Sequence, residues 1–330
     1  MQEPKLLTLL PEEYVCTPDG MEIDREGNLI LACPNFADMT MPSCICKIDK
    51  DYNVTKWFDV PVCEETGEAR AMGLAFGPDW DLFIVDNQGW SGDEKLVFKG
   101  RILRVRLNGD KVEKVTVVAS GMEHPNGIRI WGNYLYVTQS LLTKVKTESG
   151  NLLSCVYRFH LDDVNVAVTN TLSDVNILAT WETYNPDDQY GMDGIVFDKD
   201  GNMYVGNFGD GEVFKVSFNE DGSVKENVSF AKDPKNLRST DGMTIDEYGN
   251  IYVADFVVNA IARISKDGKV TRIAQSPDTD GFNGELDQPG EPCVWNGKIA
   301  VSCFDCVVGA DKVNTKHEMP ATMSLLEIQP

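Results

Sequence analysis

The side chains best suited to chemistry in this sequence are acidic or amide residues that each stand directly before a glycine. They recur at distant positions and open similar stretches of sequence: Asp19, Asn126, Asp193 and Asp241. An isolated Asp-Gly pair is most often a turn or the entry to a strand. Several carboxylate and amide oxygens in one register could instead bind a hard divalent cation, provided that the fold brings them together.

The stretches that these residues open are copies of one repeat. From Asp241 to Ala254, as in the other clear copies, two runs of alternating apolar residues flank a Gly-Asn pair. Such alternation is typical of strands, and Gly-Asn suits the tight turn of a hairpin. Looser copies begin near Met72, at Asn126 and near Glu291, which makes six copies with a period of about fifty residues. A third strand is expected in every copy, and a fourth in the first five.

This pattern predicts an all-β fold, a six-bladed β-propeller of four-stranded blades, in a single domain over residues 1–330. The sixth copy lacks a fourth strand, and the apolar stretch from Lys5 to Leu9 precedes the first copy. We expect this N-terminal strand to close the last blade and so protect the sheet edges. Longer insertions are expected to wall one face of the ring; they are residues 61–71, 88–99, 141–153, 184–190 and 304–322.

The propeller geometry predicts where the repeated oxygen-bearing residues lie. Because the first strand of each blade lines the central tunnel, the residues that open the six copies should converge at one tunnel mouth. In chain order these are Asp19, Met72, Asn126, Asp193, Asp241 and then Gly290 or Glu291. Crowded carboxylates must be neutralised, and a bound cation does so. The all-oxygen set favours calcium; magnesium and manganese stay open, and zinc suits such ligands less well.

The overall charge argues against several kinds of partner. The 52 acidic residues outnumber the 30 basic ones, and the formal charge of -22 repels nucleic acid and anionic lipid. Apolar stretches are far shorter than the roughly 20 residues that cross a bilayer. We therefore expect neither nucleic acid nor a membrane as a partner, and the oligomeric state is left open.

The N-terminal stretch and the cysteines bear on the compartment. The first residues lack the basic and apolar regions of a secretory signal, so we expect a cytoplasmic protein, with an exported protein whose signal was removed as the alternative. The nine cysteines show no repeated pairing frame, which favours reduced thiols.

The repeat motifs resemble those of a known family. The segments that carry the likeness are Pro125-Asn126-Gly127, Asp241-Gly242 with Asn250 to Asp255, and Pro292 to Trp295. They are similar to the senescence marker protein, gluconolactonase and luciferin-regenerating-enzyme-like family, whose members hold calcium or another divalent ion with oxygen ligands. The resemblance implies the same four ligands at matching positions, although blade one has Asp19 where the family usually has Glu, and blade four has Asp193 where Asn is common.

The resemblance also implies an activity. Family members mostly hydrolyse lactones, so we expect a small lactone or ester as substrate, with the metal polarising its carbonyl and a carboxylate activating water. Asp241 is the candidate for that base. His124 is a second catalytic candidate, because distant relatives use histidine at this mouth; a packed strand-entry residue is the alternative reading.

Other readings of the same residues stay open. Met72, Trp90, Tyr190 and Trp295 are candidates for an apolar substrate wall, although aromatic residues in a propeller commonly pack between blades. The protein could also be a non-catalytic propeller that binds a partner on one face, since fold does not dictate function. A lyase or isomerase acting on a sugar derivative at the same metal site is a further alternative.

Overall fold

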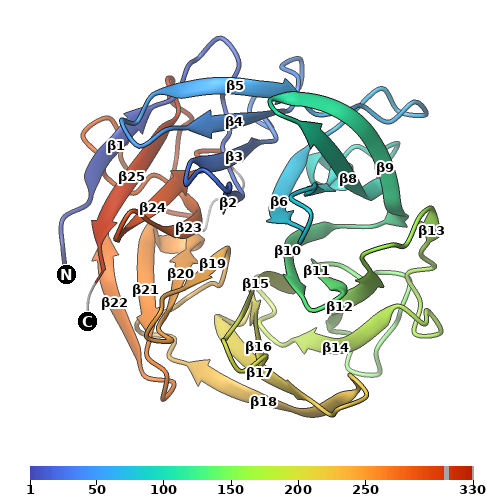
Figure 1. Cartoon of the computed structure of the whole chain (residues 1–330). Coiled ribbons are helices and arrows are strands. Elements are labelled where there is room, and N and C mark those ends of the chain that lie inside the picture. The colour runs from blue at the N-terminus through green and yellow to red at the C-terminus, as the bar shows by residue number, and fades with distance from the viewer. Residues whose placement is uncertain (308–311, 329–330) are drawn as a thin grey trace.

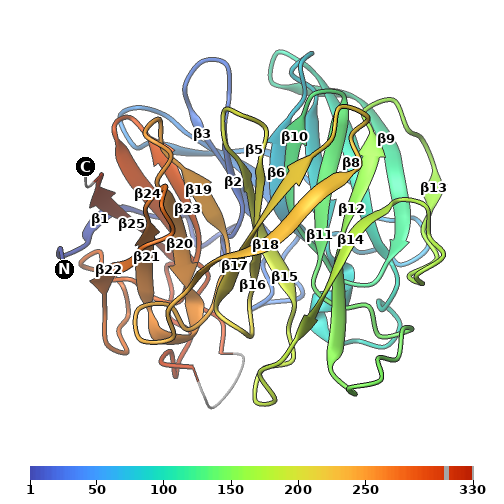
Figure 2. The same cartoon turned by 90° about the horizontal axis from the view of Figure 1, so that it is seen from below.

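The computed structural model describes residues 1–307 and 312–328. Its strands form six sheets that stand as blades around a central axis (Figure 1). Figure 2 shows the same blades from the side. The predicted all-β, six-bladed propeller is therefore confirmed. Among the described residues the helical elements are two short 3-10 turns, η1 (Gln88–Ser91) and η2 (Phe256–Val258), and none is long and apolar enough to cross a membrane.

The strands of each blade follow one another from the tunnel outward. Blade one contains β2 (Met21–Ile23), β3 (Leu29–Cys33), β4 (Cys44–Ile48) and β5 (Val54–Asp59). Blade two contains β6 (Ala71–Phe76), β7 (Leu82–Asp86), β8 (Gly100–Asn108) and β9 (Lys111–Met122). Blade three contains β10 (Pro125–Trp131), β11 (Tyr134–Gln139), β12 (Leu152–His160) and β14 (Ile177–Thr183).

The second half of the ring repeats this order. Blade four contains β15 (Met192–Phe197), β16 (Met203–Asn207), β17 (Glu212–Phe218) and β18 (Val224–Lys232). Blade five contains β19 (Met243–Ile245), β20 (Ile251–Asp255), β21 (Ala260–Ile264) and β22 (Val270–Gln275). Blade six contains β23 (Pro289–Trp295), β24 (Lys298–Cys303), β25 (Thr322–Glu327) and β1 (Lys5–Leu9).

The N-terminal strand closes the ring, as predicted. Strand β1 pairs antiparallel with β25, with Lys5 opposite Leu325 and Leu9 opposite Thr322. The N-terminus lies beside this blade in Figure 1. The pairing satisfies the outer edge of β25, which would otherwise expose unpaired backbone groups.

One strand was not expected from the sequence. The two-residue β13 (Val166–Ala167) leaves blade three and pairs in parallel with β9 of blade two, with Val166 opposite Ala119. It is too short to show an alternating pattern, so only the contact with the neighbouring blade defines it.

The core lies between adjacent blades. The second strand of several blades is buried along its whole length, as in β3, β7, β16 and β20. These strands are rich in Leu, Ile, Val and Ala because both of their faces meet a neighbouring sheet. The packed blades form the rigid support for the residues at the tunnel mouth.

Candidate functional site

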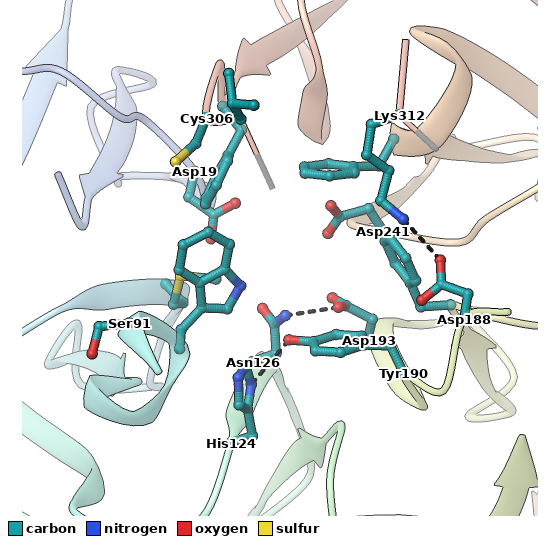
Figure 3. A pocket seen from close by; sticks show the side chains of 16 residues that line it. Asp19, Ser91, His124, Asn126, Asp188, Tyr190, Asp193, Asp241, Cys306 and Lys312 are labelled. Carbon is teal, nitrogen blue, oxygen red and sulfur yellow. Dashed lines mark hydrogen bonds and ion pairs between the residues drawn. The ribbon is translucent and has the colours of Figure 1, made fainter. Parts of the chain in front are cut away.

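The four predicted metal ligands come together at one mouth of the tunnel. Asp19, Asn126, Asp193 and Asp241 line a cavity of about 480 Å³, and Figure 3 shows their side chains around a common space. Each stands at or just before the first strand of its blade, in β10 and β15 and ahead of β2 and β19. The structure therefore places them as the repeat predicted, while their role as ligands stays a prediction.

The glycine after each of these residues has a steric cause. A Cβ on Gly20 would lie 2.2 Å from the carbonyl oxygen of Met72, and one on Gly127 would lie 2.6 Å from that of Asp193. The same contact recurs from blade to blade, because the first strands converge toward the axis and only a hydrogen atom fits between them. The repeated Asp-Gly and Asn-Gly pairs thus reflect close packing around the tunnel as well as the chemistry of the mouth.

The mouth carboxylates are buried, or in the case of Asp241 partly buried, and lie close to one another. Asp19 is 6% exposed and Asp193 is 3% exposed, and Asn126 Nδ2 donates to Asp193 Oδ2 at 2.8 Å. Burial, and then the charge of Glu291, raise the pKa of Asp19 to about 8. The pKa values of Asp193 and Asp241 are also raised, first by burial and then by the neighbouring carboxylates. These groups need either protons or a cation, and an all-oxygen donor set suits a hard ion such as calcium.

An ion pair lies directly beneath the mouth. Arg129 Nη2 is 2.6 Å from Glu291 Oε1 and also donates to the carbonyl of Met243 at 3.0 Å. Burial raises the pKa of Glu291, while Arg129 opposes that rise. Burial likewise raises the pKa of Glu22, and Arg129 again opposes it. The Arg129 guanidinium is therefore ion-paired with Glu291 and also lowers the pKa of Glu22 through its charge.

The structure settles which residue of blade six faces the mouth. A Cβ on Gly290 would lie 2.9 Å from Asp19 Oδ1, so the missing side chain makes room for that carboxylate. Glu291 lies deeper and binds Arg129. Of the two alternatives left by the sequence, Gly290 is the one beside Asp19, and it supplies no ligand side chain.

His124 lines the cavity but is held in a neutral form. Burial lowers the pKa of His124 to about 3. Its Nδ1 lies 2.9 Å from the Tyr190 hydroxyl and 3.1 Å from Asn87 Nδ2. An amide N–H can only donate, so in this arrangement Nδ1 accepts and the ring proton is on Nε2. Such a group is a poor acceptor for a catalytic proton and is better suited to orienting Tyr190.

Aromatic side chains form one wall of the cavity. The rings of Trp90 and Phe304 lie 5.2 Å apart, Phe304 and Phe256 5.8 Å, Phe256 and Phe208 5.8 Å, and Phe208 and Tyr190 5.2 Å. Sequence reasoning missed the three phenylalanines. A signal was present, because each directly follows the second strand of its blade.

The predicted wall residues have mixed outcomes. Met72, Trp90 and Tyr190 line the cavity, but the suggestion of Trp295 is wrong. Its indole Nε1 donates to the carbonyl of Gly27 at 2.8 Å, and its ring packs in the core between blades one and six. Trp295 is the last residue of β23, so it lies at the end of the strand opposite the mouth.

Three of the five insertions reach the cavity. Residues 88–99 contribute Trp90 and Ser91, residues 184–190 contribute Asp188 and Tyr190, and residues 304–322 contribute several more. Lys312 Nζ is 3.0 Å from Asp188 Oδ2, which joins the second and third of these loops (Figure 3). Part of the expected 304–322 wall, residues 308–311, lies outside the described residues. The insertions at 61–71 and 141–153 supply no lining side chain from the described chain.

Fold and site together define a six-bladed propeller with an oxygen-rich tunnel mouth. Residues 212–282, which span the last two strands of blade four and all of blade five, match the family described as the SMP-30/gluconolactonase/LRE-like region. This match confirms the resemblance indicated by the motifs. No curated protein has a sequence that matches the chain.

Several solved structures share the architecture. A luciferin-regenerating enzyme is 13% identical with a TM-score of 0.64, covering 98% of this chain and 95% of its own. A gluconolactonase from Xanthomonas campestris is 14% identical with a TM-score of 0.61, covering 99% and 95%. Regucalcin from Agrobacterium tumefaciens, a calcium-binding protein, is 14% identical with a TM-score of 0.60, covering 99% and 94%. At these identities the likeness shows a common fold.

Proposed function

We propose that this protein is a divalent-metal-dependent hydrolase of a small lactone or ester, with calcium as the metal. The observation that carries the proposal is the convergence of two buried aspartates, the partly buried Asp241 and Asn126 on a cavity with an aromatic wall. The family match over residues 212–282 supports the same class of activity. A cavity of about 480 Å³ suits a small molecule rather than a polymer.

The proposed ligands are Asp19, Asn126, Asp193 and Asp241. Calcium bound there supplies Lewis acidity, which polarises a carbonyl and stabilises the charge that develops on its oxygen. Asp241 acts as the general base that removes a proton from the attacking water. Its raised pKa means that it can do so only when a neighbouring positive charge keeps it ionised.

The remaining cavity residues position the substrate. The Tyr190 hydroxyl lies 2.9 Å from His124 Nδ1 and donates its proton to that nitrogen. Its oxygen can therefore accept one hydrogen bond at the cavity wall. The neighbouring rings of Phe208 and Phe256 pack against the apolar face of a substrate. The substrate is therefore expected to combine a lactone or ester carbonyl with at least one apolar face.

The test combines metal content with turnover. Chelator-treated wild type is titrated with calcium while the hydrolysis of a panel of lactones and esters is followed. Wild type should show calcium-dependent turnover, and Asp241→Asn should lose it by at least about a hundredfold because it removes both a ligand and the base. Asp200→Asn, which removes an exposed aspartate of the β15–β16 turn, is the matched control and should behave as wild type.

The outcomes separate the alternatives. Calcium binding without turnover of any panel member would refute hydrolysis and favour a binding role or another reaction at the same site. Absence of metal binding at the mouth would refute the proposal as a whole.

A further inference from the structure

A second group of carboxylates lies in blade six, away from the tunnel mouth quartet. Asp287 stands two residues before β23, Asp305 two residues after β24, and Glu318 four residues before β25. Because neighbouring strands are antiparallel, the start of β23, the end of β24 and the start of β25 lie at one end of the sheet. We propose that these three residues bind a second divalent cation, which fastens the loop that walls the substrate cavity.

The geometry of the group fits a cation. One ligand oxygen from each of the three carboxylates lies within 4.8 Å of the other two. Asp287 is 1% exposed and Asp305 is 2% exposed. An ion with oxygen ligands at about 2.3–2.6 Å can touch all three, and water or further oxygens complete its shell.

Two oxygens of the group are buried without a partner. Within the described part of the chain, Asp287 Oδ1 and Glu318 Oε2 are inaccessible and accept no hydrogen bond. An unpaired buried carboxylate oxygen carries a large desolvation cost that is normally met by a hydrogen bond, a charge or a metal. Asp305, by contrast, is held in place by Asn314 Nδ2 at 3.0 Å and by the Glu318 backbone N–H at 2.8 Å.

The surrounding charges do not neutralise the group. His317 Nδ1 is 3.1 Å from Asp305 Oδ2, and Lys316 acts on Glu318 from the exposed side. Two further aspartates, Asp278 and Asp280, add negative charge, and burial with the neighbouring carboxylates raises the pKa of Asp287 to about 8. A divalent cation compensates this excess more fully than a single histidine. Because every candidate ligand is oxygen, calcium or magnesium is favoured over zinc.

The position of Asp305 connects this group to the cavity. Its neighbours Phe304 and Cys306 both line the substrate cavity, and so does Lys312 farther along the same loop. Asp305 and Glu318 stand near the two ends of this loop, and Asp287 belongs to the rigid entry of β23. A cation held by all three therefore fixes both ends of the loop to the blade and keeps Phe304 in the aromatic wall.

The decisive experiment counts ions and probes the loop separately. Chelator-treated full-length protein is titrated with calcium chloride, and in parallel with magnesium chloride, by isothermal calorimetry. Wild type should bind two calcium ions, and Asp287→Asn should bind one. Asp280→Asn removes an equally charged but exposed neighbour and should still bind two. The double variant Asp241→Asn with Asp287→Asn should bind none.

Limited trypsin digestion supplies the second readout. Trypsin can cleave after Lys316, which is exposed within the loop. If the loop must release the ion before it can be cleaved, a calcium concentration a hundredfold above the Kd should slow this cleavage by about a hundredfold. This protection should persist in Asp241→Asn and vanish in Asp287→Asn. If Asp287→Asn does not unfold cooperatively, and so is not properly folded, Glu318→Gln replaces it. The same loss of one calcium ion and of protection is then expected.

Two results would overturn the inference. One is two calcium ions in Asp287→Asn or Glu318→Gln, and the other is a wild type whose single ion disappears in Asp241→Asn. Neither result bears on hydrolysis, so this inference and the proposed function can fail independently.

Discussion

The affinity of the tunnel mouth for calcium should fall steeply as the pH is lowered. The mouth aspartates of the metal-free protein hold protons at neutral pH because burial and mutual repulsion raise their pKa values. Calcium needs the ionised carboxylates, so it must displace those protons. For Asp19, whose pKa is raised to about 8, the ionised fraction is about one half at pH 8 and about one hundredth at pH 6.

The size of the effect follows from these fractions. Protonation of Asp19 alone makes the apparent Kd for calcium about fiftyfold larger at pH 6 than at pH 8. Asp193 and Asp241 also have raised pKa values, so fiftyfold is the smallest change expected. The Asp287→Asn background removes the carboxylate group of blade six from the measurement.

Calorimetry at pH 6, 7 and 8 gives the Kd directly. Repeating each titration in buffers of different ionisation enthalpy gives the number of protons released, which should be about one or more per ion at pH 7. A Kd that changes by less than about threefold from pH 6 to pH 8, with no dependence on the buffer, would refute the electrostatic reasoning.

The same shifts make the stability of the metal-free protein depend on pH. Between the unfolded pKa near 4 and the raised folded value, the folded state binds more protons than the unfolded state, so stability must fall as the pH rises. The Tm of chelated protein should therefore drop from pH 5 to pH 8. Saturating calcium should remove this drop, since the ion replaces the protons. A chelated Tm that rises over this window would contradict the raised pKa values.

Three further changes test parts of the site. Arg129→Met leaves Glu291 buried without its partner and should cost about 3–5 kcal/mol in urea unfolding at pH 8; stability equal to wild type would show that the pair contributes little. Gly290→Ala places a Cβ 2.9 Å from Asp19 Oδ1 and should weaken calcium binding at the mouth at least about tenfold by calorimetry, so an unchanged Kd would argue against Asp19 as a ligand. Phe256→Ala opens the aromatic wall and should raise KM more than it lowers kcat, whereas a fall in kcat alone would place the ring near the reacting atoms instead.

Sequence reasoning worked well where a residue repeats in register. Asp193 and Asp241 were placed at one mouth because their copies share the same spacing from the Gly-Asn turn. Strand β1 was assigned to the last blade because the sixth copy lacked an outer strand, and the pairing of Lys5 with Leu325 confirms it. The error over Trp295 arose because a residue of a first strand lies at the mouth only near the start of that strand, and Trp295 is the last residue of β23.

The features formed by irregular loops could not be predicted from the repeat in the sequence. The parallel pairing of β13 with β9, the Lys312 to Asp188 bridge and the grouping of Asp287 with Asp305 and Glu318 join segments with no common repeat. Their distances depend on how each insertion folds back over its blade. No local propensity specifies this, since loops take their conformation from the contacts they reach.

The sequence by itself determined the blade count, the closure of the ring and the four residues at the mouth, because a repeat of fixed period imposes one geometry on every copy. Tertiary structure alone decided the electrostatics of that mouth. The pKa of Asp19 depends on how deeply it is buried and on Glu291 of the neighbouring blade six, and the pairing of Arg129 with Glu291 depends on a contact between blades three and six. Burial and distance are properties of the assembled ring, and charge interactions follow from both.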